Sequence, residues 1–128
     1  RGLALVVLDL DDFKEVNDRI GHLAGDAVLA DAAGRVREVV RSADIACRVG
    51  GDEFAVIAPE SGLEDARELV ERIQRAIASR PLGNAGHVQV SAGVAELHLE
   101  DDAVSLFERA DGRLYAAKQT RKGGLAPI

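Results

Sequence analysis

A continuous apolar run, LALVVL at residues 3–8, ends abruptly in the acidic residues Asp9, Asp11 and Asp12. An apolar run of this length without alternation is typical of a strand that is buried on both faces. Because the acids follow at once, we expect this strand to deliver carboxylates at its carboxyl end. We expect Asp9 to face a functional site, and we interpret Asp11 and Asp12 as surface acids.

The next segments predict a helix and a hairpin. After a polar loop over residues 17–25, apolar side chains recur at helical spacing over residues 28–40. Two short strand-like runs, 45–49 and 54–58, flank the sequence GGDE. Because paired glycines permit a tight reversal, these runs predict a β-hairpin whose loop carries two acids.

The second half of the chain predicts a helix, a strand and a last helix. Ser61 and Glu64 have the spacing of a capping box, which predicts a helix start there and a helix that continues to about residue 78. A strand is expected at about 87–94 and a helix at about 103–118. The resulting order, β-α-β-β-α-β-α, contains the βαββαβ pattern of ferredoxin-like folds. We therefore predict an α/β (α+β) fold with a palm-like core, in which helices cover a mixed, mainly antiparallel sheet.

Length and charge limit the classes of function. The chain has 128 residues and a formal net charge of -6. Its length suits one domain, 1–128. The negative charge argues against binding to a nucleic-acid polymer, whereas a small nucleotide held with a metal ion stays compatible. We expect no direct membrane insertion, because the sequence has no long apolar run. The single cysteine, Cys47, is interpreted as a small buried hydrophobe, and we expect a reducing, cytoplasmic location.

Asp52 and Glu53 in the hairpin have two interpretations. They are either a solvated acidic turn or ligands of a cation, because adjacent acids beside buried strands are costly without one. The ends of neighbouring strands converge on one edge of a sheet, so Asp9 and Asp52 would face each other across a metal ion. Carboxylate oxygens completed by phosphates and water are the ligands that Mg²⁺ prefers. Such an ion supports phosphoryl transfer.

The sequence RVGGDEF at 48–54 resembles the signature hairpin of GGDEF diguanylate cyclases. Further motifs match in the family's order, and the resemblance covers nearly the whole chain. They are DLDDFK at 9–14, Asn17-Asp18, Gly21-His22, Gly25-Asp26, SAGV at 91–94, and Ala110-Asp111 through Leu114-Tyr115 to Ala117-Lys118. The resemblance implies condensation of two GTP molecules into cyclic di-GMP and pyrophosphate by a homodimer in which each chain holds one GTP.

The resemblance also implies roles for individual residues. Asp9, the carbonyl of Leu10, Asp52 and Glu53 would bind Mg²⁺, for which Mn²⁺ would substitute, and Glu53 would alternatively act as the base. The implied catalytic residues are Asp52, Glu53 and Lys118. Asn17 and Asp26 would read the guanine edge, while His22 has either a nucleotide contact or a structural role. The full set of implied GTP-binding residues is Phe13, Asn17, His22, Asp26, Gly50, Gly51, Lys118 and Lys122.

A second group of residues resembles the family's product-inhibition motif, RxxD. Arg41 and Asp44 would bind cyclic di-GMP as an inhibitor, and Arg72 would supply a second guanidinium. Without the family, Arg41 and Asp44 are interpreted as a surface ion pair. Lys118 likewise has the plainer interpretation of a lysine at a helix end.

The sequence departs from the family pattern in two places. A helix that usually precedes the first strand is missing, and we expect it to lie outside this sequence. We separately expect attached sensory or regulatory domains in a longer protein. Lys122 stands where the family tends to have arginine, so phosphate affinity would be weaker. The alternative functions are a catalytically silent GGDEF domain that senses GTP or cyclic di-GMP, and another palm-type nucleotidyl cyclase or polymerase.

Overall fold

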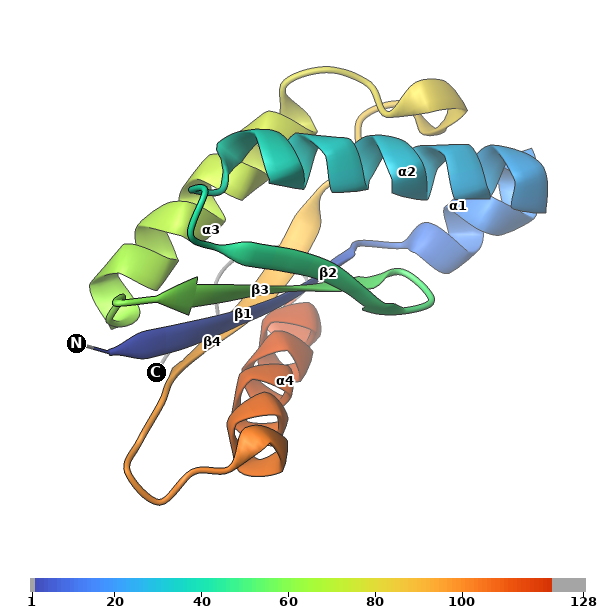
Figure 1. The fold of residues 1–128 in the computed structure, drawn as a ribbon. Helices are drawn as coiled ribbons and strands as arrows, with labels where there is room; N and C mark the ends of the chain where they lie inside the picture. The colour runs from blue at the N-terminus through green and yellow to red at the C-terminus, as the bar shows by residue number, and fades with distance from the viewer. Residues whose placement is uncertain (1, 121–128) are drawn as a thin grey trace.

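The computed structural model describes residues 2–120, which form a four-stranded sheet covered by helices on both faces (Figure 1). The strand order is β2-β3-β1-β4, and all three neighbouring pairs are antiparallel. The elements are β1 (Leu3–Leu10), α1 (Phe13–Ile20), α2 (His22–Val39), β2 (Ile45–Gly50), β3 (Glu53–Pro59), α3 (Leu63–Ala78), the 3₁₀ turn η1 (Gly83–Ala85), β4 (Val90–Glu96) and α4 (Ala103–Thr120).

The predicted α+β palm-like architecture is confirmed, although the sheet is antiparallel throughout rather than mixed. The reason is that β1 lies between β3 and β4. The connection through α3 crosses over β1, so β3 and β4, which run in the same direction, are not neighbours. No helix of the described residues is long and apolar enough to cross a membrane.

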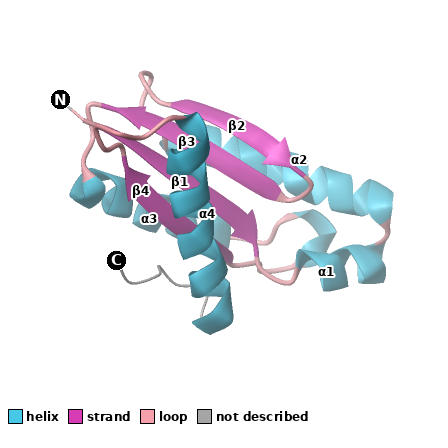
Figure 2. Ribbon diagram, turned by 90° about the horizontal axis from the view of Figure 1, so that it is seen from below, coloured by secondary structure: helices cyan, strands magenta, loops and turns pink. Residues whose placement is uncertain are grey.

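The apolar run of β1 serves two cores. Val6 and Leu8 pack with α2 and α3 on one face, whereas Leu5 and Val7 pack with α4 on the other. Figure 2 shows α4 alone on its face of the sheet, with α2 and α3 behind. Because alternate side chains of a strand point to opposite faces, both sets must be apolar, which explains the unbroken run.

The prediction of a polar loop over residues 17–25 is wrong. That segment holds the second half of α1 and the start of α2, which are separated at Gly21 with φ 90. The segment is polar because α1 has no fully buried residue. The helix α1 is held to the core by the partly buried side chains of Phe13, Val16 and Ile20, whose spacing is helical.

Two local predictions also need correction. The start of α3 is displaced by one residue from the expected Ser61 and Glu64 box, because Gly62 is the N-cap and its N–H donates to Asp65 at 3.1 Å. Ser61 is buried instead, and its hydroxyl donates to the Pro59 carbonyl at 3.1 Å. Cys47 is exposed, not buried, because β2 is an edge strand that is largely uncovered.

Candidate functional site

Strand register brings the expected acids together. Asp9 at the end of β1 is the direct antiparallel partner of Glu53 at the start of β3, and Asp52 precedes Glu53 in the hairpin. Burial raises the pKa of Asp9, and the negative charge of Asp52 adds to this increase. The ammonium of Lys118 opposes it. The end of the first strand and the glycine hairpin therefore form one acidic group.

Glu53 carries the most strongly shifted pKa at this site. Burial raises its pKa to about 7, with further contributions from a hydrogen bond to Asp111 on α4 and from the charges of Asp9 and Asp52. Carboxylates that lie close together without a cation resist ionisation, because each negative charge disfavours the next. The group therefore has the electrostatic character of a site for a positive ion.

A positive charge from the protein already contacts these acids. The Lys118 ammonium pairs with Asp9, pairs with Asp11 at 2.8 Å, and donates to the Leu10 carbonyl at 3.2 Å. Burial disfavours the charged ammonium, but the hydrogen bonds to Asp11 and Asp9 outweigh this effect and raise the Lys118 pKa. Asp11 is thus not a plain surface acid, since its side chain is only 14% exposed. Asp12 is exposed, as expected.

The expected metal ligands fit a hard cation only with help from a substrate. Within residues 2–120, no group of three or more acidic, histidine or cysteine side chains is placed to hold a metal ion. Asp9 and the Leu10 carbonyl nevertheless share one cation in the structure, the Lys118 ammonium. Mg²⁺ is commonly held by one or two carboxylates completed by phosphates and water, so this oxygen set suits it.

A pocket of about 330 Å³ opens between the first two helices and the hairpin. It brings together five residues expected from the sequence and three that were not expected. The expected residues are Phe13, Asn17, Asp26, Gly51 and Asp52, and the additional residues are Lys14, Leu29 and Arg48. The residues proposed for guanine therefore share one pocket with a hairpin carboxylate.

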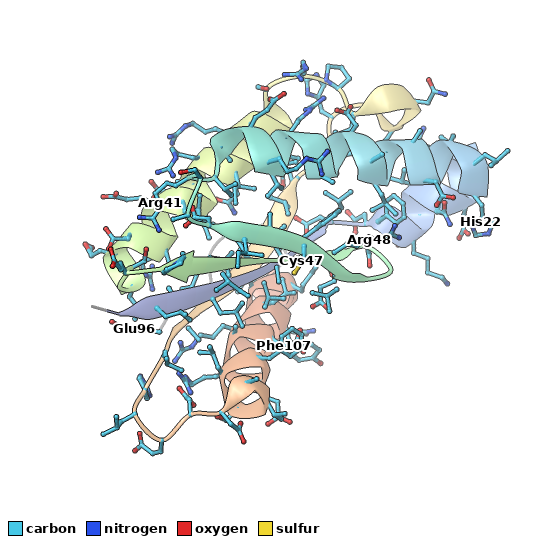
Figure 3. The ribbon with its side chains drawn as sticks, in the orientation of Figure 1. His22, Arg41, Cys47, Arg48, Glu96 and Phe107 are labelled. Atoms are coloured by element: carbon cyan, nitrogen blue, oxygen red, sulfur yellow. The ribbon has the colours of Figure 1, made fainter. Side chains whose placement is uncertain are left out.

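Gly25 allows α1 and α2 to approach closely at this pocket. A Cβ at position 25 would lie 2.0 Å from Oδ1 of Asn17, so only glycine leaves room for that side chain. The Asn17 amide is also hydrogen-bonded to Nδ1 of His22 at 2.8 Å. His22 is exposed at the end of the molecule formed by α1 and the start of α2 (Figure 3). It is not among the residues that line the pocket. Its structural interpretation, as a partner that orients Asn17, has the support of this contact.

The remaining expected site residues are more scattered. Gly50 ends β2 and is not among the residues that line the pocket. Lys118 reaches the acids at the end of β1 from α4, which packs on one face of the sheet. Lys122 lies outside the described residues. Arg48, which sequence reasoning used only as part of the signature, closes the hairpin by donating from Nε to the Gly51 carbonyl at 2.8 Å.

Arg41, Asp44 and Arg72 line a separate pocket of about 160 Å³ beside α3. Arg41 donates to Asp44 at 2.7 Å and to the Ser61 hydroxyl at 3.0 Å. Burial opposes ionisation of Asp44, but hydrogen bonds from Arg41 outweigh it and hold the Asp44 pKa below its usual value. The three residues expected for product inhibition thus come together from the loop before β2 and from α3, and Ser61, Asp65 and Glu68 join them.

The fold and the site together define a class of α+β domains that handle nucleotides. Its features are an antiparallel palm-like sheet, acids at a strand end and in a hairpin, and a pocket beside these acids. The family model described as "Diguanylate cyclase, GGDEF domain" matches residues 1–124. The chain belongs to the GGDEF family.

Relatives with known names support this assignment. Diguanylate cyclase DgcP of Pseudomonas aeruginosa is 44% identical over 126 residues, which cover 96% of this chain and 19% of the relative. Diguanylate cyclase VdcA of Vibrio cholerae is 38% identical over 132 residues, which cover 98% of this chain and 39% of the relative. The chain therefore spans well under half the length of either protein.

A solved structure shows the same fold. The GGDEF domain of DgcB from Caulobacter crescentus, in complex with c-di-GMP, superposes with a TM-score of 0.92 at 34% identity. The superposition covers 98% of this chain and 77% of that chain.

Proposed function

We propose that this domain is a diguanylate cyclase that uses Mg²⁺, or Mn²⁺ in its place, to condense two GTP molecules into cyclic di-GMP. The observation that carries the proposal is the shared pocket: Asp52 of the hairpin lines the same cavity as Asn17 and Asp26. This combination fits a guanine base at one end of a nucleotide and its phosphates at the other. The named relatives are diguanylate cyclases, which agrees with it.

The roles of the residues follow from their chemistry. Asp9, the Leu10 carbonyl and Asp52 would hold the metal ion, which neutralises phosphate charge when bound. Asp26 would accept from the paired N–H donors of guanine, and adenine lacks that pair. Glu53, which lies directly opposite Asp9 and next to Asp52, would accept the proton of a ribose 3′ hydroxyl. Lys118 would contact phosphate.

Each condensation step is an in-line displacement. The 3′ oxygen of one GTP forms a bond to the α-phosphorus of the other GTP. The bond between that phosphorus and the oxygen that bridges the α- and β-phosphates breaks, and pyrophosphate leaves. Two such steps close the ring. Because the pocket of Asn17, Asp26 and Asp52 suits one nucleotide, we propose that two chains face each other and that the homodimer is the active form. Specific activity should therefore rise with protein concentration.

The test of catalysis compares two charge-neutralising variants. Asp52→Asn should lower cyclic di-GMP formation from GTP and Mg²⁺ by about 100-fold or more, as expected when electrostatic support of a phosphoryl transfer is removed. Glu71→Gln, at an exposed position on α3, should leave the rate unchanged. If the folded, paired parent chain binds GTP but forms no product, the silent sensor function replaces this proposal.

We also propose that cyclic di-GMP inhibits the enzyme at Arg41, Asp44 and Arg72. The support is that their pocket combines two guanidinium groups with a carboxylate, which suits phosphate and guanine edges. Arg41→Ala should relieve product inhibition and leave the initial rate intact. The matched control is Arg75→Ala, an exposed arginine on the same helix as Arg72. Equal inhibition of Arg41→Ala and the parent protein would overturn this assignment.

A further inference from the structure

Ser91 on β4 is a buried polar residue whose hydroxyl serves a charged group. Its exposed fraction is 0%, and its Oγ donates to Oδ1 of Asp11 at 2.7 Å. Ser91 is also the antiparallel partner of Asp9 in the β1 and β4 register. A buried hydroxyl needs a partner, and here the partner is a carboxylate at the edge of the site rather than a carbonyl of the sheet.

Asp11 is fixed from two sides. Its backbone N–H donates to the Gln89 carbonyl at 2.8 Å, and its side chain accepts from Ser91. The same Oδ1 atom that accepts from Ser91 also accepts from the Lys118 ammonium at 2.8 Å. Ser91 therefore holds the oxygen that Lys118 uses, and β4 sets the place of an ammonium carried by α4.

Lys118 has three acceptors, and only one of them lies outside the proposed metal ligands. Asp9 and the Leu10 carbonyl would be taken by the metal ion, and two cations on the same oxygens would repel each other. Asp11 is then the acceptor left to Lys118. An ammonium kept at Asp11 would stay beside the residues proposed to hold the metal ion, where it could contact the phosphates of a nucleotide.

We propose that Ser91 and Asp11 are positioning residues that hold Lys118 beside the proposed metal ligands for contact with the phosphates of GTP. This inference rests on the proposed function for the role of Lys118. Ser91 acts only through Asp11, and Asp11 acts through Lys118. It follows that removal of Lys118 makes the identity of residue 91 irrelevant to nucleotide binding.

The test is a double-mutant cycle on affinity, which does not depend on turnover. Calorimetry with Mg²⁺ and the α,β-methylene analogue of GTP, which resists cleavage at the α-phosphate, gives the dissociation constant. Ser91→Ala should weaken binding by about 3- to 10-fold in the parent chain. The same substitution should change binding by less than about 2-fold in a Lys118→Met background. Because Ser91→Ala changes no charge, a long-range field effect cannot produce this difference.

A matched serine provides the control. Ser105 Oγ donates to Oδ1 of Asp101 at 2.7 Å, the same contact at the opposite end of α4. Ser105→Ala should leave affinity within about 2-fold in both backgrounds. If Ser91→Ala fails to fold, Ser91→Cys, which keeps the side chain's size and charge but weakens its donor, repeats the cycle.

The outcomes separate this inference from the proposed function. Equal weakening by Ser91→Ala with and without Lys118 would overturn the inference and leave the cyclase intact. Binding of the analogue without product from GTP would overturn the cyclase, while the cycle still decides the role of Ser91. A parent chain that does not bind the analogue would overturn both.

Discussion

Gly93 on β4 is the position where the structure predicts the largest effect of one added methyl group. A Cβ there would lie 2.2 Å from the Ala110 carbonyl oxygen, 2.3 Å from the Leu114 nitrogen and 2.8 Å from the Arg113 carbonyl carbon. All three atoms belong to the backbone of α4, so no side chain can rotate away. An ordinary contact begins at 3.4 Å, which means that α4 must move outward by about 1 Å.

That movement loosens a whole core. Leu106, Ala110 and Leu114 of α4 pack against Leu5 and Val7 of β1, and these contacts open as the helix shifts. Overpacking a core typically costs about 1–3 kcal/mol, and displacement of a backbone places Gly93→Ala at about 3 kcal/mol or more. Urea denaturation followed by circular dichroism measures this loss in the free energy of unfolding.

Gly112 in the same helix gives a control of opposite sign. A Cβ at Gly112 would meet no atom within 4 Å, and the residue is exposed. Gly112→Ala should therefore stabilise the chain by about 0.5–1 kcal/mol through helix propensity. If Gly93→Ala leaves the free energy of unfolding unchanged, the close packing of α4 on β4 is refuted.

Three further predictions use the same chain. The pKa of Glu53 in the fold, about 7, exceeds its usual value of 4.5, so its contribution to the free energy of unfolding is complete below pH 4.5 and is lost as pH rises through 7. Glu53→Gln should remove that decline, as measured by urea denaturation between pH 4 and 8. Arg35 is 2% exposed and donates to the Ile77, Arg80 and Pro81 carbonyls at 2.7–2.9 Å. In urea denaturation, Arg35→Leu should therefore lower the free energy of unfolding by about 3 kcal/mol. Arg37→Leu, at an exposed position, should lower it little. Asp26→Asn should weaken binding of the GTP analogue by about 10-fold, because an amide cannot accept from both guanine donors. The variant should also prefer the GTP analogue over the ATP analogue less strongly than the parent chain does. Competition calorimetry measures both effects.

The main helices and strands could be predicted from the sequence because their hydrophobic patterns are strong. The run at residues 3–8 and the helical spacing at 63–78 and 103–118 each matched an observed element. The short helix α1 was missed because it buries no residue completely. The exposure of Cys47 was missed because local pattern does not tell whether a strand lies at the edge of a sheet.

The site was predictable where its residues are close in sequence and not where they are distant. Asp52 and Glu53 adjoin each other, and the geometry of a hairpin implies their common edge. Asp11 was misread as a surface acid, because its partners Ser91 and Lys118 lie 80 and 107 residues further along the chain. Only the packing of β4 and α4 brings those partners to it.

The same packing links stability to the chemistry proposed here. The absence of a side chain at Gly93 lets α4 lie directly on β4, and Arg113 of α4 donates to the Val94 carbonyl at 2.9 Å. From this helix Asp111 contacts Glu53, and Lys118 contacts Asp9 and Asp11. A shift of α4 by about 1 Å would move Asp111 and Lys118 relative to Glu53, Asp9 and Asp11, which do not belong to this helix. Misplacing catalytic groups by about 1 Å can lower a reaction rate by about 100-fold. Gly93 therefore fixes where Asp111 and Lys118 meet these acids, although it does not line the pocket of Asn17 and Asp52. Given the proposed function, a substitution at Gly93 should impair nucleotide binding even at temperatures where the chain stays folded.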